Sequence, residues 1–254
     1  MTDESAEKLR NLTHTRLLSQ LRSDVHHGAT AAVLAAIEMF LACGWDPDTL
    51  LQEGLLQTLH ALDGDVRTGI LFAPEALRAI ATIEAALALL RPWLGRRTGA
   101  PFGTAVIGTV RGDRHGIGKD IVAMALSRAG FAVVDLGTDT PGEAFLEALS
   151  AHHPDVLALS TQLTAGIPPM KLLIERMDAL GIRDEHLVLV GGTPLNEEFA
   201  RAVGADAYCR DAASCVETAR SLLAARRAAE AAGMNARISR LRGARARERP
   251  ERTG

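Results

Sequence analysis

The chain has 254 residues and a formal net charge of −3, and 47% of its residues are hydrophobic. These values are typical of a globular protein with room for two compact domains, and they exclude a chain that is disordered throughout. Three scattered cysteines are too few for a disulfide framework. No run reaches the ~18 apolar residues of a membrane helix, and the acidic residues 1–5 do not form a secretory signal. We therefore expect a cytoplasmic protein without a membrane partner.

The first part of the chain shows only helical patterns. They predict four helices, over residues 6–22, 29–43, 47–62 and 74–90. Asp46 and Pro47 form a start signal for the third helix, and the sequence Asp-Gly-Asp at 63–65 is expected to end it. Helices with short connections favour an antiparallel four-helix bundle, which we assign to residues 1–97.

Strands alternate with helices in the next part of the chain. Runs rich in β-branched and apolar residues predict five strands, at 104–110, 131–136, 155–160, 187–191 and 205–208. Three signals mark helix starts. They are a capping box at 140–143, a proline pair at 168–169 and a Thr-Pro pair at 193–194. The alternation predicts an α/β domain over residues 98–232, with a flavodoxin-like or Rossmann-like, doubly wound parallel sheet of five strands. Ligands bind such sheets at the switch point, where the loops 111–118 and 160–164 meet.

The last residues, 233–254, are rich in arginine and interrupted by glycine and proline. We expect an extension of the last helix that frays into a disordered basic tail. No aromatic residue interleaves with the arginines, so a solvated tail is favoured over a segment that binds nucleic acid.

The most informative motif is GDRHGIGK at residues 112–119, directly after the first predicted strand. Neutral imidazole is a good ligand for a first-row transition metal, and its second ring nitrogen usually donates to a carboxylate. Asp113 can accept that proton from His115, and Ser160, at the end of the third strand, can hydrogen-bond the aspartate. The pattern predicts a metal site at His115 with an Asp113–Ser160 relay behind it.

Glycines surround this motif. Gly116, Gly118 and the pair Gly191 and Gly192 have no Cβ, so a bulky ligand can approach the backbone closely. No second His or Cys stands at the spacing of zinc ligands, and residues 112–119 lack the spacing of a phosphate loop. These two kinds of site are disfavoured, and a surface histidine in a Gly-rich turn stays as the remaining alternative.

Residues 15–225 resemble corrinoid (vitamin B12) proteins of the methionine-synthase and methanogenic-methyltransferase type, in which a four-helix module precedes a Rossmann-like cobalamin domain. The segments 108–119, 159–164, 190–194 and 211–214 carry the resemblance, with 52–55 and 72–75 in the helical part. The resemblance implies that cobalamin, in its methyl or adenosyl form, binds base-off with His115 as the protein ligand of cobalt. The other expected cofactor contacts are Asp113, Arg114, Gly116, Ile117, Gly118, Ser160, Gln162, Leu163, Thr164, Gly191, Gly192 and Ala212, together with Glu53, Val66 and Ala73 from the helical domain.

The chain departs from the pattern of this family at several positions. Gln162 stands where the family usually has leucine. Val66 or Arg67, depending on the placement of a one-residue gap, and Ala73 stand where a phenylalanine and a leucine commonly shield the upper face of the cobalt. Smaller side chains there would leave room for an upper ligand bulkier than methyl, such as adenosyl, or for a second molecule. Alternatively, Leu71 or Phe72 supplies the missing bulk.

The resemblance favours a corrinoid methyl carrier that works with partner methyltransferase proteins and is not a complete enzyme alone. The alternative is a cobalamin-dependent sensor or regulator, including a photoreceptor, with a bulkier upper ligand or a second chromophore and a signalling partner. A radical mutase subunit is a third interpretation. A homo-oligomer is compatible with each of them, and nucleic acid is not an expected partner.

Overall fold

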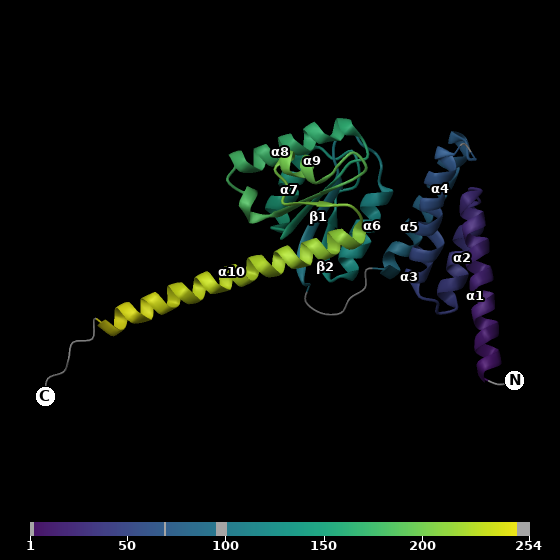
Figure 1. Cartoon of the computed structure of the whole chain (residues 1–254), viewed down its shortest axis with the longest axis horizontal. Coiled ribbons are helices and arrows are strands. Elements are labelled where there is room, and N and C mark those ends of the chain that lie inside the picture. Colours follow the sequence, from purple (N-terminus) through teal and green to yellow (C-terminus); the bar gives the residue numbers. More distant parts are fainter. Residues whose placement is uncertain (1–2, 69, 95–100, 248–254) are drawn as a thin grey trace. The chain divides into compact units, whose positions relative to one another are not determined.

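The computed structural model describes residues 3–68, 70–94 and 101–247 (Figure 1). The chain divides into two compact units, Met1–Gly99 and Ala100–Gly254, and each has its own buried core. The predicted domain boundary, between residues 97 and 98, lies outside the described residues. Within the described ranges, no helix combines the length and the apolar character that a membrane span requires.

The first unit is helical, and the four predicted helices are all present. They are α1 (Asp3–His26), α2 (Thr30–Ala42), a composite third helix and α5 (Ala73–Leu94). The composite helix consists of α3 (Pro47–Thr49), a π-helical segment (Leu50–Leu56) and α4 (Gln57–Arg67), and Asp46 caps it as predicted. Every helical segment of this unit except the short α3 contributes buried side chains to the core, among them Leu18, Leu21, Ile37, Phe40, Leu50, Leu55, Leu62, Ile83 and Leu87.

The third helix ends later than predicted. The expected stop at residues 63–65 is wrong, because α4 continues to Arg67. A contact between distant segments lies at this end of the helix, where Nε2 of His26 is 2.9 Å from Oδ2 of Asp65. The carbonyl of Asp65 also accepts the N–H of Ile70 at 2.9 Å. These bonds hold Asp65 within the helix despite its weak intrinsic preference for that conformation.

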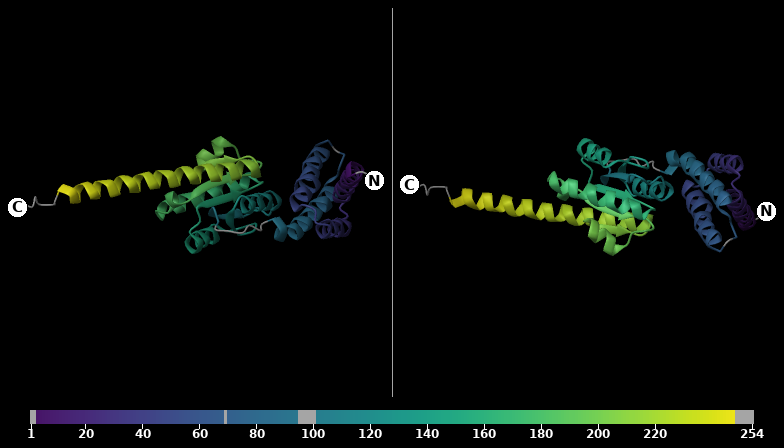
Figure 2. Two further views of the ribbon diagram at one scale, coloured as in Figure 1. Left: turned by 90° about the horizontal axis from the view of Figure 1, so that it is seen from below. Right: turned by 90° about the horizontal axis from the view of Figure 1, so that it is seen from above.

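The second unit contains a parallel sheet, as predicted. Its strands are β1 (Gly103–Thr109), β2 (Phe131–Asp135), β3 (Val156–Ser160), β4 (Leu187–Gly191) and β5 (Ala207–Cys209), in the order β2-β1-β3-β4-β5. The helices are α6 (Ile117–Arg128), α7 (Gly142–His152), α8 (Ile167–Ala179), α9 (Glu197–Val203) and α10 (Ala212–Arg247). Helices α7, α8 and α9 pack on one face of the sheet, and α6 and α10 on the other (Figure 2). The predicted α/β, doubly wound fold is confirmed.

Two predicted helix starts differ in the structure. Helix α7 begins at Gly142 without a side-chain cap, because the hydroxyl of Thr140 donates to the carbonyl of Leu136 instead of forming a capping box. Helix α9 begins at Glu197 rather than at residues 193–194, and the side chain of Asn196 caps it. Both starts are set by side-chain hydrogen bonds that compete with the predicted caps.

Helix α10 continues to Arg247, beyond the predicted end of the α/β domain at residue 232. Alanine and arginine are frequent in this stretch and are strong helix formers, whereas a glycine inside a helix costs only about 1 kcal/mol. The end of the predicted tail, residues 248–254, lies outside the described residues.

Candidate functional site

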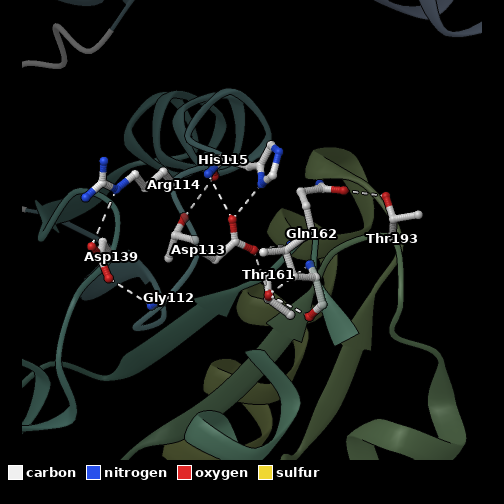
Figure 3. Close-up of polar contacts among 10 residues, drawn as sticks. Gly112, Asp113, Arg114, His115, Asp139, Thr161, Gln162 and Thr193 are labelled. Atoms are coloured by element: carbon white, nitrogen blue, oxygen red, sulfur yellow. Dashed lines mark hydrogen bonds and ion pairs between the residues drawn. The ribbon is translucent and has the colours of Figure 1, made fainter. Parts of the chain in front are cut away.

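The motif at residues 112–119 lies at the carboxyl edge of the sheet, at its switch point. Thr109, the last residue of β1, is in register with Ser160, the last residue of β3, so the loops after these strands leave the sheet side by side (Figure 3). The hydroxyl of Thr109 donates to the carbonyl of His115 at 3.1 Å. This bond ties the start of α6 to the end of β1.

The carboxylate of Asp113 is completely buried and accepts four hydrogen bonds. Oδ1 accepts from the backbone N–H of His115 at 2.9 Å and from Nδ1 of its ring at 2.7 Å. Oδ2 accepts from the hydroxyl of Thr161 at 2.7 Å and from the backbone N–H of Gln162 at 2.5 Å. Burial alone would raise the pKa of Asp113, but these hydrogen bonds outweigh it and lower the pKa to about 2.

The ionised Asp113 determines the tautomer of His115. An ionised carboxylate can only accept hydrogen bonds, so Nδ1 of the ring carries a proton, and a ring with this single proton presents a lone pair at Nε2. Among the residues that the structure describes, none hydrogen-bonds Nε2, and 60% of the side chain is exposed. A ring held in this way is prepared to bind a metal that arrives from outside the protein.

The predicted relay ends in Thr161, not in Ser160. The buried hydroxyl of Thr161 donates to Asp113 at 2.7 Å. Ser160 is the last residue of β3, and the N–H of Thr161 continues the ladder by donating to the carbonyl of Gly191 at 3.1 Å. Successive side chains on a strand point to opposite sides, so only one of the two hydroxyls faces the carboxylate.

Two glycines make room for Thr161. A Cβ on Gly192, whose φ is +127°, would lie 1.7 Å from the carbonyl oxygen of Thr161, and a Cβ on Gly166 would lie 2.1 Å from its hydroxyl. Packing alone therefore requires glycine at both positions. A Cβ on Gly118 would meet the side chain of Gln162 at 3.6 Å, an ordinary van der Waals contact, so packing within the protein does not require glycine there.

The loops after β3 and β4 are joined by a side-chain pair. The hydroxyl of Thr193 donates to the amide oxygen of Gln162 (Figure 3). Ala212, the first residue of α10, follows β5 at the same edge. The structure therefore gathers at the carboxyl edge all the α/β residues that the sequence predicts as cofactor contacts, namely Asp113, Arg114, His115, Gly116, Ile117, Gly118, Ser160, Gln162, Leu163, Thr164, Gly191, Gly192 and Ala212.

The other three predicted contacts belong to the helical unit. Glu53 is exposed in the π-helical segment, a distortion that is frequent at functional sites. Val66 is 45% exposed near the end of α4, and Ala73 is exposed at the start of α5. Between them, Leu71 is buried, whereas Phe72 is 69% exposed. Of the two bulky alternatives, only Phe72 presents its side chain outward.

Asp139 is a site residue that the sequence analysis missed. It lies in the loop between β2 and α7, and its Oδ1 accepts the N–H of Gly112 at 2.8 Å. Its own N–H donates to the carbonyl of Asp113 at 2.7 Å, and its Oδ2 lies 3.6 Å from Nε of Arg114. The signal that could have found it is an aspartate in a Gly-x-Asp turn that follows a predicted strand at the same edge.

Comparisons with known proteins identify the family. Residues 103–220 match the family model of the B12 binding domain. The chain is 36% identical over 188 residues to the trimethylamine corrinoid protein 1 of Methanosarcina acetivorans, an alignment that covers 73% of this chain and 87% of that protein. It is 33% identical over 215 residues to the dimethylamine corrinoid protein of Methanosarcina barkeri, with 84% and 100% covered.

A solved structure shares the fold. The monomethylamine corrinoid protein of Methanosarcina barkeri matches with a TM-score of 0.71 and 24% identity, and the match covers 82% of this chain and 99% of that one. The resemblance stated from the sequence is confirmed. The chain belongs to the corrinoid protein family that carries a B12 binding domain.

Proposed function

We propose that this chain is a methyl carrier that binds cobalamin with His115 as the lower ligand of cobalt, in place of the cofactor's own base. The observation that carries the proposal is Nε2 of His115, which has no hydrogen-bond partner among the described residues while Asp113 holds the opposite ring nitrogen. The relatives named corrinoid proteins support the choice of cofactor.

The residues at this edge fit a cofactor that brings most of its own metal ligands. Within the described part of the chain, no group of three or more His, Cys, Asp and Glu side chains could hold a bare metal ion. A metal bound through His115 therefore needs further ligands from outside, which the nitrogens of a corrin ring supply. The exposed side chain of Leu163 at this edge suits a large, mostly apolar ligand.

When bound, cobalamin supplies a cobalt ion that can accept a methyl group and pass it on. The protein supplies the ligand and its electrostatics. Asp113 holds a proton on Nδ1 of His115 and thereby keeps Nε2 directed outward, and Thr161 fixes the carboxylate from behind. Loss of the Nδ1 proton strengthens donation from Nε2, and protonation of the relay weakens it. Partner methyltransferases would bring the methyl donor and the acceptor.

The test compares the full-length protein with His115→Ala after loading with hydroxocobalamin and reduction to the paramagnetic cobalt(II) state. Electron paramagnetic resonance with isotopically labelled histidine nitrogen shows whether a protein nitrogen binds cobalt. We expect the cobalt signal of the wild-type protein to be split by the labelled histidine nitrogen. The splitting should be lost in His115→Ala, which should also retain the cofactor about 10- to 100-fold more weakly. His152→Ala, an exposed histidine at the end of α7, is the matched control and should retain the wild-type spectrum.

A wild-type spectrum in which dimethylbenzimidazole stays on cobalt would contradict the proposal. The carrier role has its own assay, in which the methylcobalamin-loaded protein is mixed with candidate methyltransferases. The names of the relatives suggest trimethylamine and dimethylamine as the first donors to test. If no partner exchanges a methyl group with the loaded protein, a carrier role is excluded.

A further inference from the structure

We infer that Asp139 is a positioning residue for the cobalt ligand. It braces residues 112–114 from the side opposite to the Asp113–Thr161 relay and thereby sets where His115 lies. The inference rests on the proposed function, in which His115 binds cobalt. It adds a residue from the loop after β2 to a site otherwise built at the carboxyl ends of β1, β3, β4 and β5.

Asp139 contacts three successive residues of the loop that carries His115. Its Oδ1 accepts the N–H of Gly112 at 2.8 Å, and its backbone N–H donates to the carbonyl of Asp113 at 2.7 Å. Its Oδ2 lies 3.6 Å from Nε of Arg114, whose side chain is largely exposed (Figure 3). The first two bonds restrain the backbone, whereas the exposed ion pair contributes little.

The backbone conformation of Asp139 is uncommon. Its φ of +54° places it in the left-handed region, which aspartate and asparagine tolerate better than most residues. Such conformations cost free energy and persist where the surrounding structure over-determines them. Here, one residue combines that conformation with a side-chain acceptor and a backbone donor, and both point at the loop of His115.

The loop that carries Asp139 is itself anchored at its base. The carboxylate of Asp135 accepts the N–H of Gly137 at 2.9 Å and lies 2.6 Å from Nζ of Lys119, a buried residue in the first turn of α6. Thr138 lies against Gly116, where its Cγ2 would be 3.2 Å from a Cβ. The β2–α7 loop therefore holds the segment 112–119 before and after His115.

Through this arrangement, Asp139 affects the position of the His115 ring indirectly. The ring of His115 is positioned by Oδ1 of Asp113, and that carboxylate is only as well placed as the backbone of Asp113. The carbonyl of Asp113 accepts its bond from Asp139. Loosening Asp139 should therefore let Nε2 move relative to the cobalt, although Asp139 touches neither the ring nor the cofactor.

The test uses two substitutions in the full chain. Asp139→Gly keeps the left-handed backbone without strain but removes the acceptor for Gly112. Asp139→Asn keeps both the acceptor and the tolerance for the conformation. With hydroxocobalamin as the probe, we expect Asp139→Gly to lose cofactor about 10-fold faster and to show a smaller fraction of cobalt with histidine nitrogen. Asp139→Asn should rescue both quantities to within about twofold.

A matched control lies at the other end of β1. Asp155 also accepts a backbone N–H, that of Thr104 at 2.8 Å, and pairs with Arg227 at 3.2 Å. Asp155→Gly should lower thermal stability as Asp139→Gly does but leave the fraction of histidine-bound cobalt unchanged. If both variants lose histidine ligation equally, the effect is general destabilisation and the inference is overturned.

A second measurement needs no cofactor. In the cofactor-free protein, amide hydrogen exchange at Gly112 should be about 10-fold faster in Asp139→Gly and restored in Asp139→Asn. Wild-type ligation together with wild-type exchange in Asp139→Gly would overturn the inference and leave the proposed function intact. If the wild-type protein shows no histidine nitrogen on cobalt, the proposed function is overturned. That test uses the wild-type protein alone and does not depend on the variants of Asp139.

Discussion

Asp113 buries a charge without a lysine or an arginine among its hydrogen-bond donors. Its two oxygens are satisfied by the ring and backbone of His115, the hydroxyl of Thr161 and the backbone of Gln162. Hydrogen bonds to a charged group are stronger than those between neutral groups, which offsets the cost of burial. Because none of the described donors to this carboxylate is a lysine or an arginine, its charge acts on the ring of His115.

Of the four hydrogen bonds to Asp113, the one from the hydroxyl of Thr161 can be removed by a single substitution with the least change in shape. Thr161→Val keeps the shape but leaves Oδ2 of Asp113 with one hydrogen bond fewer, which should cost about 1–3 kcal/mol of unfolding free energy. Thr161→Ser keeps the hydroxyl and should cost less. Urea denaturation of the cofactor-free protein measures both. Equal losses in Thr161→Val and Ser160→Ala would show that Ser160 shares the role.

Whole elements follow from the sequence more closely than their ends do. All five strands start within two residues of their predicted starts. A buried parallel strand is a short apolar run, which is directly visible in the sequence. The end of α4 could not be predicted, since it involves His26 and Asp65, which are far apart in the chain. The choice of Thr161 over Ser160 was equally hidden, because it depends on which face of a strand meets Asp113.

The start of α10 offers a prediction that depends on pH. Oδ1 of Asp211 accepts the N–H of Ser214 at 2.8 Å, and this backbone bond lowers the pKa of Asp211. The stabilisation is therefore complete above the ordinary pKa of aspartate and is lost as the pH falls through the lowered value. Asp211→Ala should cost about 0.5–2 kcal/mol at neutral pH and less in acid, as measured by urea denaturation.

The control for this cap is Asp211→Asn, which keeps the acceptor but cannot titrate. It should retain most of the stability at neutral pH and remove the part of the pH dependence that Asp211 contributes. If Asp211→Ala shows the same loss of stability in acid as at neutral pH, the carboxylate is not the group that stabilises the start of the helix.

At the scale of the whole molecule, the predicted cofactor contacts are divided between the two units. The relay and its brace lie entirely in the unit Ala100–Gly254, whereas Glu53, Val66 and Ala73 belong to the unit Met1–Gly99. Each unit buries its own apolar core, so each has the means to fold on its own. His115, the proposed ligand of cobalt, should then be in place whether or not the helical unit is intact.

Two matched core substitutions test this independence. Leu87 is buried in α5 and Leu157 in β3, and replacing either by alanine should cost about 2–5 kcal/mol. In calorimetry, Leu87→Ala should lower only the transition of the helical unit and leave histidine ligation of cobalt unchanged. Leu157→Ala should lower the other transition, which hydroxocobalamin should raise again because it binds the folded state. If Leu87→Ala lowered both transitions by the same amount, the two units would unfold as one, and the assignment of the ligand site to an independent α/β unit would fail.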